Sequence, residues 1–388
     1  MLAIGLDGKL PNFRIELDRM DTVVDLVLDT TRNAYPSFDV PFHSRWRHFV
    51  SNGDDRWAAV ASHASWPDRA ARARAEFDLA IVSVFLDAGA GPSWRYRDPG
   101  TGLAIGRSEG LGLASLAMFT DGVFSAAPSE TLRADADKLA NLDVAVLARG
   151  MQVSELNPLV GLDGRTDLLR RLGRLVTSKP DIFGSHDTPR PGGLYDRLAM
   201  LAEGGKLPAP TILAELLQQL GPIWPSRLTL GGIALGDCWR HPALTTADAT
   251  SGLMPLHKLS QWLAYSLIEP LQKSGIDVTD IDGLTGLAEY RNGGLFIDSG
   301  VLAFRDADAA QREHEVGSPL VVEWRALTVA LLDRVADGMR QRLGRDATTM
   351  PLAKILEGGT WAAGRRLARE RRADASPPVK VISDGTVF

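Results

Sequence analysis

The sequence predicts a mainly α-helical fold with one hydrophobic core and only minor β structure. Apolar residues make up 45% and charged residues 23% of the 388 residues, a composition typical of globular proteins. Long segments carry apolar residues at the spacing of an amphipathic helix. The segments between them are short and rich in glycine and proline, as turns and loops are. A chain of this length can enclose one large core or two domains.

In the first half of the sequence, apolar periodicity and capping residues predict five helices. Asp21 can cap the first, and Ser129 can begin the fourth because Glu130 would lie in its first turn, where the helix dipole favours an acid. The second helix is expected at 76–89, the third at 106–119, and the fifth is expected to begin at Thr166 or Asp167. The second is apolar enough to lie at the centre of the fold.

In the second half, the segment Leu220–Leu244 is too interrupted for a long helix and is expected to form short strands or an ordered loop. Three further helices are expected at 255–275, 322–344 and 351–372. The tail 376–388 alternates between apolar and polar residues, which predicts a terminal strand packed on the body.

No segment has the composition of a linker that would force a domain boundary. We therefore expect a single domain over residues 1–388. The alternative is a subdivision into residues 1–190 and 191–388, in which the second half carries most of the functional residues.

Charge and cysteine content exclude several classes of protein. The formal net charge of −5 argues against a protein that binds the nucleic-acid backbone, which normally has a basic face. Cys238 is the only cysteine, so neither an intrachain disulfide nor a thiolate metal cluster can form. We find no signal segment and no apolar run near the ~18 residues of a membrane span. The sequence therefore predicts a cytoplasmic protein without a membrane partner.

Motifs for nucleotides, metals and covalent catalysis are weak or absent. The sequence has no GxxxxGK[ST], HExxH or GxSxG pattern, and GLGLASLAMF near Gly110 lacks the strand and spacing of a phosphate loop. His43 and His48 are five residues apart and lack carboxylates at ligand spacing. Cys238 is more typical of a packed residue than of a nucleophile. We therefore expect neither a metal nor a cofactor.

The segment Gly283–Arg305 has the strongest signal for a functional site. It places Glu289, Tyr290, Arg291 and Asp298 among glycines and apolar residues. Shortly after it, Glu323 and Arg325 lie within another apolar run. Because an isolated buried charge is costly, these groups need partners. Such groups form either a polar site or a set of structural ion pairs.

The spacing of the two acids limits how they can act together. Glu289 and Asp298 are nine residues apart, about 180° out of phase on a continuous helix. They can share a pocket only if the element is broken at 292–294, a step that contains two glycines. The alternative is structural: two packed helices in which Glu289 and Arg291 form ion pairs with Arg325 and Glu323.

Basic and aromatic residues supply candidates for binding an anion. HSRWRHF places Arg45 and Arg47 around Trp46, as a pocket for an anion or a phosphate would require. Trp94 lies in a loop between glycine and arginine residues, and Lys258 precedes an aromatic helix face that carries Trp262 and Tyr265. Each of these groups could equally be solvated or packed in the core.

Motifs along nearly the whole chain resemble the uracil-catabolism family of fungi and bacteria, long filed as a domain of unknown function. They are HSRWRHF, LDAGAGPSWRYRD, RSEGLGLASLAMF, GDCWRHPAL, GLMPLHKLSQWLAYSLIEPLQ, DGLTGLAEYRNGGLFIDSGVL, SPLVVEWRALTVALLDR, LAKILEGGTWAAGR and the terminal SDGTVF. The segment before Leu10 is short for that family, which would be explained by a missing opening helix.

The order of segments also resembles the queuosine salvage proteins, which hydrolyse the N-glycosidic bond of queuosine 5′-phosphate. Their Asp-Tyr-Arg motif is similar to Glu289-Tyr290-Arg291, with a glutamate in place of the aspartate. Their Glu-x-x-Arg segment resembles Glu323 to Arg325 at a different spacing, and a lysine at a helix start corresponds to Lys258. Their Asn-rich loop that ends in tryptophan resembles the segment from Leu86 to Trp94, which includes Asp87. This resemblance implies a mainly helical, DNA-glycosylase-like fold.

Together the two resemblances imply an N-ribosyl hydrolase of uracil catabolism. Its substrate would be ribosylurea, with the 5′-phosphate as the expected form, and its products urea and the ribose compound. A carboxylate suits this reaction because positive charge develops on the anomeric carbon.

The resemblance implies roles for particular residues, assigned as follows. The catalytic carboxylate facing the sugar would be Glu289, with Asp298 or Glu323 as the second acid, and Arg291 and Arg325 would orient these acids. The phosphate group would be bound by Lys258 together with Arg45 or Arg47. The substrate site would be lined by Trp46, Trp94, Tyr290 and Asp87. Association with other enzymes of uracil catabolism is also expected. Two other functions stay open: a non-catalytic partner of a ring-opening enzyme, and a metal-dependent amidohydrolase.

Overall fold

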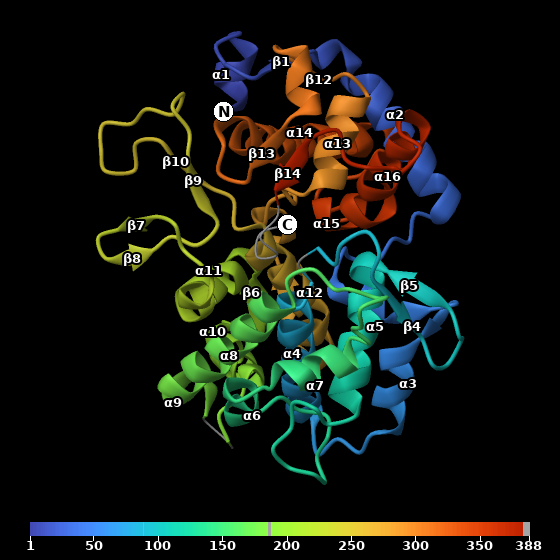
Figure 1. Cartoon of the computed structure of the whole chain (residues 1–388), viewed down its shortest axis with the longest axis vertical. Coiled ribbons are helices and arrows are strands. Elements are labelled where there is room, and N and C mark those ends of the chain that lie inside the picture. The colour runs from blue at the N-terminus through green and yellow to red at the C-terminus, as the bar shows by residue number, and fades with distance from the viewer. Residues whose placement is uncertain (88, 185–187, 383–388) are drawn as a thin grey trace.

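The computed structural model describes residues 1–87, 89–184 and 188–382. The chain is mainly helical, as the sequence predicts, and its strands are short (Figure 1). Within the described residues, every sheet has only two strands. Helices therefore supply most of the core and most of the positions available to a functional site.

The α-helices are α1 Leu2–Leu6, α2 Met20–Ala34, α3 Arg56–His63, α4 Arg69–Phe85, α5 Arg107–Thr120, α6 Ala136–Ala140, α7 Val144–Gly150, α8 Leu162–Ser178, α9 Pro180–Phe183, α10 Leu194–Leu201, α11 Ala209–Leu220, α12 Lys258–Ser274, α13 Tyr290–Asp298, α14 Pro319–Leu343, α15 Leu352–Ile355 and α16 Trp361–Arg371. A π-helical turn, Leu356–Thr360, joins α15 to α16.

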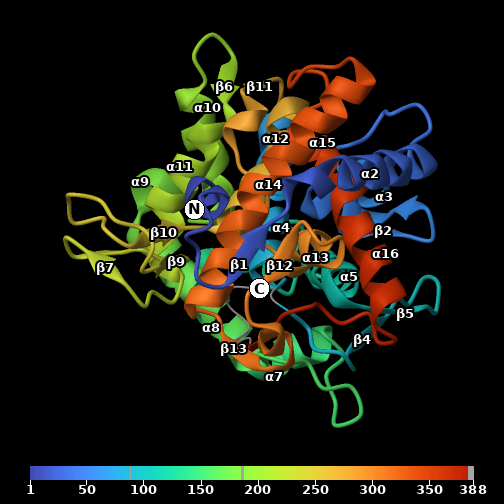
Figure 2. The ribbon, with the colours of Figure 1, turned by 90° about the horizontal axis from the view of Figure 1, so that it is seen from above.

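The strands form small ladders between the helices. Antiparallel pairs are β1 Phe13–Ile15 with β12 Leu302–Phe304, β2 Val50–Ser51 with β3 Asp54–Asp55, β4 Arg95–Arg97 with β5 Ala104–Gly106, β7 Thr229–Leu230 with β8 Ile233–Ala234, and β9 Cys238–Arg240 with β10 Leu253–Pro255. Parallel pairs are β6 Lys206–Pro208 with β11 Asp277–Thr279, and β13 Glu313–Glu315 with β14 Lys380–Ile382. The ladder β1–β12 joins the N-terminal strand to the strand that follows α13 (Figure 2), and β13–β14 joins the last strand to the one before α14.

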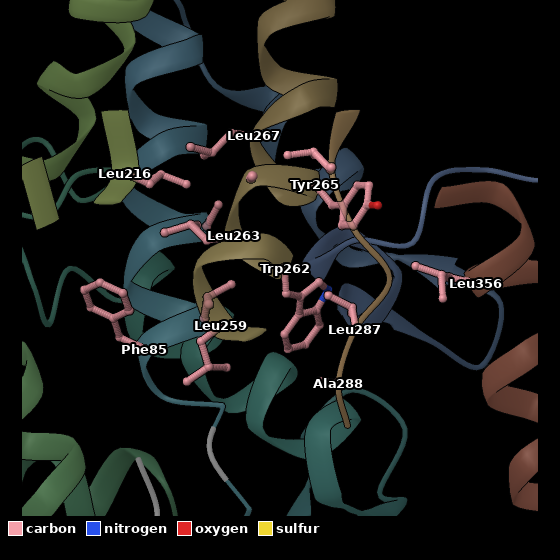
Figure 3. Close-up of a cluster of buried hydrophobic side chains, with 14 of the residues drawn as sticks. Phe85, Leu216, Leu259, Trp262, Leu263, Tyr265, Leu267, Leu287, Ala288 and Leu356 are labelled. Carbon is pink, nitrogen blue, oxygen red and sulfur yellow. The ribbon is translucent and has the colours of Figure 1, made fainter. Parts of the chain in front are cut away.

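Helix α12 lies at the centre of the molecule and is buried on nearly all faces. Figure 3 shows Leu259 and Leu263 pointing toward Leu216 of α11, whereas Trp262 points the other way, toward Leu287. Helix α4, which is buried from Ala75 to its last residue, packs along α12. Burial on every side explains why these two helices lack a polar stripe.

One cluster of buried apolar residues runs from Leu10 to Val379. It joins residues from both of the sequence halves, 1–190 and 191–388, as the packing of α4 on α12 illustrates. Among the described helices, none is both long and apolar enough to span a membrane.

One local prediction is wrong. The helix expected from Ser129 is absent from the described chain, where residues 128–129 form a turn, residues 130–135 are irregular and the next helix, α6, begins at Ala136. A break at 292–294 was the condition for Glu289 and Asp298 to share a pocket, and it is not met, since α13 is continuous through both glycines. The tail is confirmed as a strand only at Lys380–Ile382, and the terminal SDGTVF lies outside the described residues.

Candidate active site

A cavity of about 400 Å³ lies where several helices begin. Its lining includes the first residues of α5, α12 and α13, which are Arg107, Lys258 and Tyr290. Free N–H groups and the helix dipole favour negative charge at a helix N-terminus. Acids of the chain, Glu289 and Asp237, cap α13 and α12, whereas α5 has no side-chain cap and its N-terminus can face an anion.

Glu289 is an acid in the cavity wall and forms the N-cap of α13. Its Oε2 accepts a hydrogen bond from the backbone N–H of Arg291 at 2.7 Å, and its Oε1 accepts one from the N–H of Asn292. Burial raises the pKa of its carboxyl group, while these two donors and then the charge of Lys258 oppose the rise. Each carboxylate oxygen can accept a second hydrogen bond, so the capped group can still bind a ligand.

The apolar segment before α13 holds Glu289 in place. Leu287 and Ala288 are each 2% exposed, and Figure 3 shows Leu287 beside Trp262 of α12. The chain is thus anchored in the core immediately before the acid. Glu289 itself is 8% exposed. This anchoring keeps the carboxylate at the cavity instead of in bulk solvent.

Asp87 is a second acid of the cavity and follows the end of α4. Its Oδ1 accepts hydrogen bonds from the guanidinium of Arg45 and from the hydroxyl of Ser108. Burial raises the pKa of Asp87, and the charge of Arg45 opposes the rise. Within the described chain, no residue donates a hydrogen bond to Oδ2, so this oxygen is available to a hydroxyl or N–H group of a ligand.

Lys258 provides positive charge between the two acids. Burial lowers the pKa of its ammonium group, whereas the charges of Asp87 and Glu289 raise it. The residue is 8% exposed, yet none of the described carboxylates lies within 4 Å of Nζ. Nζ lies over the ring of Trp262, 5.9 Å from its centre, and without a carboxylate partner it has unused hydrogen-bonding capacity for a ligand.

Asp237 fixes the start of α12 and hence the position of Lys258. Its Oδ2 accepts the backbone N–H of Lys258 at 2.9 Å, and both its oxygens pair with Arg325 at 2.8 Å. Burial alone would raise the pKa of Asp237, but the charge and hydrogen bonds of Arg325 outweigh it and lower the pKa to about 2. Arg325 also donates to the carbonyl of Ala288 at 3.3 Å, which links α14 to the residue before Glu289.

Two arginines bring positive charge to the cavity wall. Arg107 and Arg291 both line it. Burial lowers the pKa of Arg291, and the neighbouring charges of Arg107 and Arg365 lower it further. Arg107 is half-buried and has no carboxylate within 4 Å among the described residues. These two arginines attract a ligand group with negative charge, while Glu109 in the same lining is paired with Arg365 at 3.4 Å.

Aromatic rings form much of the remaining wall. The ring of Trp262 is stacked on His43 at 6.1 Å and meets His48 edge-on at 5.4 Å. Trp361 begins α16, directly after the π-helical turn Leu356–Thr360. Single π-helical turns are often found at functional sites. The rings give the cavity flat apolar faces beside its charged groups.

Five of the predicted site residues line the cavity: Asp87, Lys258, Glu289, Tyr290 and Arg291. The others lie outside its lining: Arg45, Trp46, Arg47, Trp94, Asp298, Glu323 and Arg325. Each of these seven has a defined partner elsewhere.

Glu323 fastens the N-terminal segment of the chain to α14. Its Oε1 accepts the backbone N–H groups of Asn12 and Phe13, its Oε2 accepts the amide of Asn12, and His241 lies 3.3 Å away. The predicted pairing of Glu323 with Arg291 or Glu289 with Arg325 is therefore not the arrangement found. The structure gives Glu323 an anchoring role instead of a place beside a substrate.

Asp298 lies at the last residue of α13 and pairs with Arg372, with distances of 2.8 and 2.5 Å. Arg372 also donates to the carbonyl of Ser376, and Arg291 donates to that of Ala375. These bonds hold residues 374–377, which line the cavity. We name this segment the C-terminal strap. Asp298 thus supports the cavity wall from outside.

The arginines of HSRWRHF bind acids instead of facing the cavity. Arg45 is completely buried and pairs with Asp87, and Arg47 pairs with Glu269 at 2.7 Å. The tryptophans belong to the core: the indole N–H of Trp46 donates to the carbonyl of Ser266 at 2.7 Å, and that of Trp94 to Met151 at 2.9 Å. Neither ring can wall the ligand site.

Several lining residues received no role from the sequence: His43, His48, Arg107, Ser108, Trp262, which was noted only as part of an aromatic helix face, and Trp361. A signal existed for three of them, since the two histidines flank Trp46 and Trp262 follows Lys258 by one helical turn. Arg107 had no such signal. Its backbone is left-handed, with φ of 57°, a conformation that a sequence pattern does not predict for arginine.

A second cavity, of about 550 Å³, is lined by residues near the start of α4, among them Ala71, Arg74 and Ala75. Its three arginines are all ion-paired: Arg74 with Asp196, Arg133 with Asp135 and Arg190 with Asp78. Charged groups that neutralise one another have little left to offer a ligand. The smaller cavity, with Glu289 and Lys258, is therefore the candidate active site.

The comparisons with known proteins cover the whole chain. The model of a family described as "Protein of unknown function (DUF1688)" matches residues 1–388. The chain is 37% identical to "Protein urg3" of Schizosaccharomyces pombe over 389 residues, which cover 98% of this chain and 92% of the relative. It is 35% identical to "Uracil catabolism protein 4" of Lachancea kluyveri over 422 residues, which cover 98% and 93%. These matches confirm the family resemblance that the sequence motifs predicted.

Proposed function

Since this chain belongs to the DUF1688 family, we propose that it acts in uracil catabolism as an N-ribosyl hydrolase. Its substrate is ribosylurea, in which urea is bound to C1′ of ribose, in the form of the 5′-phosphate. The products are urea and ribose 5-phosphate. The name of one relative supports the pathway, and the cavity supports the chemistry.

The observation that carries the proposal is a buried, capped carboxylate in a cavity that is open to a ligand. As the C1′–N bond breaks, its electron pair moves to the nitrogen of urea and positive charge develops on the sugar. Glu289 stabilises this charge and accepts a proton from the attacking water, whose oxygen forms the new bond to C1′. The proton then passes to urea, which balances the reaction.

The charge distribution of the cavity supports binding of a phosphorylated sugar. Arg107 and Arg291 both line the cavity, and α5 begins at Arg107. A phosphate group beside these arginines would be bound by guanidinium groups and by the N-terminus of α5. Arg107 thereby takes the role that the sequence assigned to Arg45 or Arg47.

Other lining residues suit the ribose and urea groups. Asp87 has a carboxylate oxygen free to accept a sugar hydroxyl, and Lys258 lies near both acids. Trp262 supplies an apolar face for the ring. Selectivity would follow from these buried polar groups, because a ligand lacking their partners leaves them unsatisfied.

The test is hydrolysis of synthetic ribosylurea 5′-phosphate by the purified protein, with urea and ribose 5-phosphate quantified separately. Equimolar release of both supports the proposal. Release of ammonia and carbon dioxide without intact urea would establish an amidohydrolase instead. A rise in melting temperature with no product would establish a non-catalytic binding protein.

Comparison with unphosphorylated ribosylurea tests the assignment of the phosphate. We expect its kcat/KM to be lower by about two orders of magnitude, since ion pairs with phosphate add several kcal/mol of binding. Equal kcat/KM values for the two compounds would contradict the role of Arg107.

A further inference from the structure

His48 lines the cavity but has no place in the proposed reaction so far. It lies in the 3-10 helix Arg45–Phe49, and its ring meets Trp262 edge-on at 67°. The backbone of His48 is packed against Gly112 of α5, where an added Cβ would approach its carbonyl oxygen to 2.7 Å. The ring is therefore held firmly between two helices that also form the cavity.

Arg45 fixes which nitrogen of His48 carries the proton. Its Nη1 lies 3.1 Å from Nδ1 of His48, and a guanidinium group can only donate. Nδ1 must therefore accept, and in the neutral ring the proton is on Nε2. Arg45 is itself held by Asp87 and by a hydrogen bond to Ser83 at 2.6 Å. Nη1 of Arg45 also lies 3.1 Å from the carbonyl oxygen of Ser108, so Asp87, His48 and Ser108 share its two N–H groups.

The surroundings also keep the ring neutral. Burial lowers the pKa of His48 well below 6.5, and the charges of Arg45, His43 and Arg47 lower it further. Among the residues that the structure describes, none hydrogen-bonds Nε2, so its N–H group is free for a ligand. Because Arg45 donates to the opposite nitrogen, it polarises the ring and strengthens Nε2–H as a donor.

We propose that His48 is a catalytic residue whose Nε2–H donates a hydrogen bond to the carbonyl oxygen of the departing urea. This inference rests on the proposed N-ribosyl hydrolysis. When the C1′–N bond breaks, the electron pair left on nitrogen is delocalised onto that oxygen, which becomes more negative. A neutral imidazole N–H stabilises this charge without losing its proton. The proton that urea finally takes up comes from the attacking water through Glu289.

The test compares two leaving groups in one protein. Urea is a poor leaving group, so ribosylurea 5′-phosphate requires a hydrogen-bond donor that stabilises the departing urea. The compound 4-nitrophenyl riboside 5-phosphate releases a stable phenolate and requires no such donor. We expect His48→Phe to lower kcat/KM for ribosylurea 5′-phosphate by about 100-fold or more. The same variant should lower kcat/KM for the nitrophenyl compound by less than about fivefold. His48→Gln, which keeps an N–H donor, should recover some of the loss.

His43→Phe is the matched control, because His43 also lines the cavity and stacks on Trp262. Its effect should be equal for the two substrates. Equal losses for both substrates in His48→Phe would show a structural role and overturn the inference, and so would full activity. If the unaltered protein releases no urea, the proposed function fails and the inference fails with it.

The tautomer gives a second test that needs no substrate. Nitrogen-15 NMR of the labelled, full-length protein should show His48 as a neutral ring protonated at Nε2 from pH 6 to 8. An imidazolium signal at pH 7, or a proton on Nδ1, would overturn the inference even if His48→Phe were inactive.

Discussion

The two ends of helix α13 each carry a buried acid, and their surroundings differ. Glu289 caps the N-terminus, where backbone N–H groups bind its carboxylate. Asp298 is the last helical residue, where the dipole disfavours negative charge. Arg372 neutralises it with two hydrogen bonds. The backbone of the helix thus stabilises the charge of Glu289 without a paired cationic side chain, whereas the charge of Asp298 requires Arg372.

This difference explains why only one end is suited to catalysis. A carboxylate bound by backbone amides keeps lone pairs for a ligand and stays close to the cavity. A carboxylate in a bidentate pair with arginine has its charge and most of its acceptor capacity already used. The same contrast applies to Glu323, whose oxygens are occupied by Asn12 and Phe13.

The largest expected effect is loss of activity on changing Glu289 to glutamine. Because Gln cannot take a proton from water, kcat/KM for ribosylurea 5′-phosphate should fall by about 1000-fold or more. The melting temperature should change by only a few degrees, since a weakened N-cap costs about 1 kcal/mol. Glu315→Gln, at an exposed glutamate, is the control and should leave both quantities unchanged. Normal turnover in Glu289→Gln would refute the carboxylate assignment.

The variant Glu323→Gln should lose stability and keep its activity, the opposite of Glu289→Gln. Glutamine would bring an N–H group against the backbone donors of Asn12 and Phe13, and His241 would lose its acid. We expect a loss of about 2–4 kcal/mol in the free energy of unfolding. The folded fraction should keep kcat within about twofold of the unaltered protein. Chemical unfolding measures the free energy of unfolding, and kinetics corrected for the fraction of folded protein measure kcat. A loss in kcat without a loss in stability would contradict the anchoring role of Glu323.

Much of the fold was predictable because long periodic segments keep their structure whatever packs on them. The helices α12, α14 and α16 lie where their apolar spacing predicts. The helix expected from Ser129 fails for a local reason. The hydroxyl of Ser125 bonds Ala127 and Glu130, and Asp135 accepts the N–H of Ala126. Such side-chain bonds to the backbone compete with helix formation.

The site was predictable only where the neighbouring sequence determines it. Glu289 follows an apolar segment and precedes a helix, so its burial and its cap can be expected from local pattern. The direction of Arg45 and Arg47 cannot, because it depends on Asp87 and Glu269, which lie 42 and 222 residues away. Partners this distant are determined by the tertiary fold and not by the motif.

The variant Asp298→Asn tests the role of the ion pair at the C-terminus of α13. Without its charge, the pair with Arg372 weakens, and we expect a loss of about 1–2 kcal/mol in the free energy of unfolding. Arg372 also binds the C-terminal strap at Ser376, so a looser cavity wall should raise KM by about two- to fivefold with kcat little changed. A loss in kcat comparable to that of Glu289→Gln would instead make Asp298 a catalytic acid.

The smallest expected effect is on the pH dependence of kcat/KM, which tests the role of Glu289 at the N-terminus of α13. Burial raises the pKa of Glu289, so kcat/KM should fall in acid with a midpoint above the ordinary glutamate value of about 4.3. Below that midpoint the carboxyl is protonated and cannot accept a proton from water. The charge of Lys258 opposes the rise, so Lys258→Met should move the midpoint further up. Profiles of kcat/KM from pH 4 to 8 for both proteins measure the shift. A midpoint that moves down in the variant would show that another group controls the acid limb.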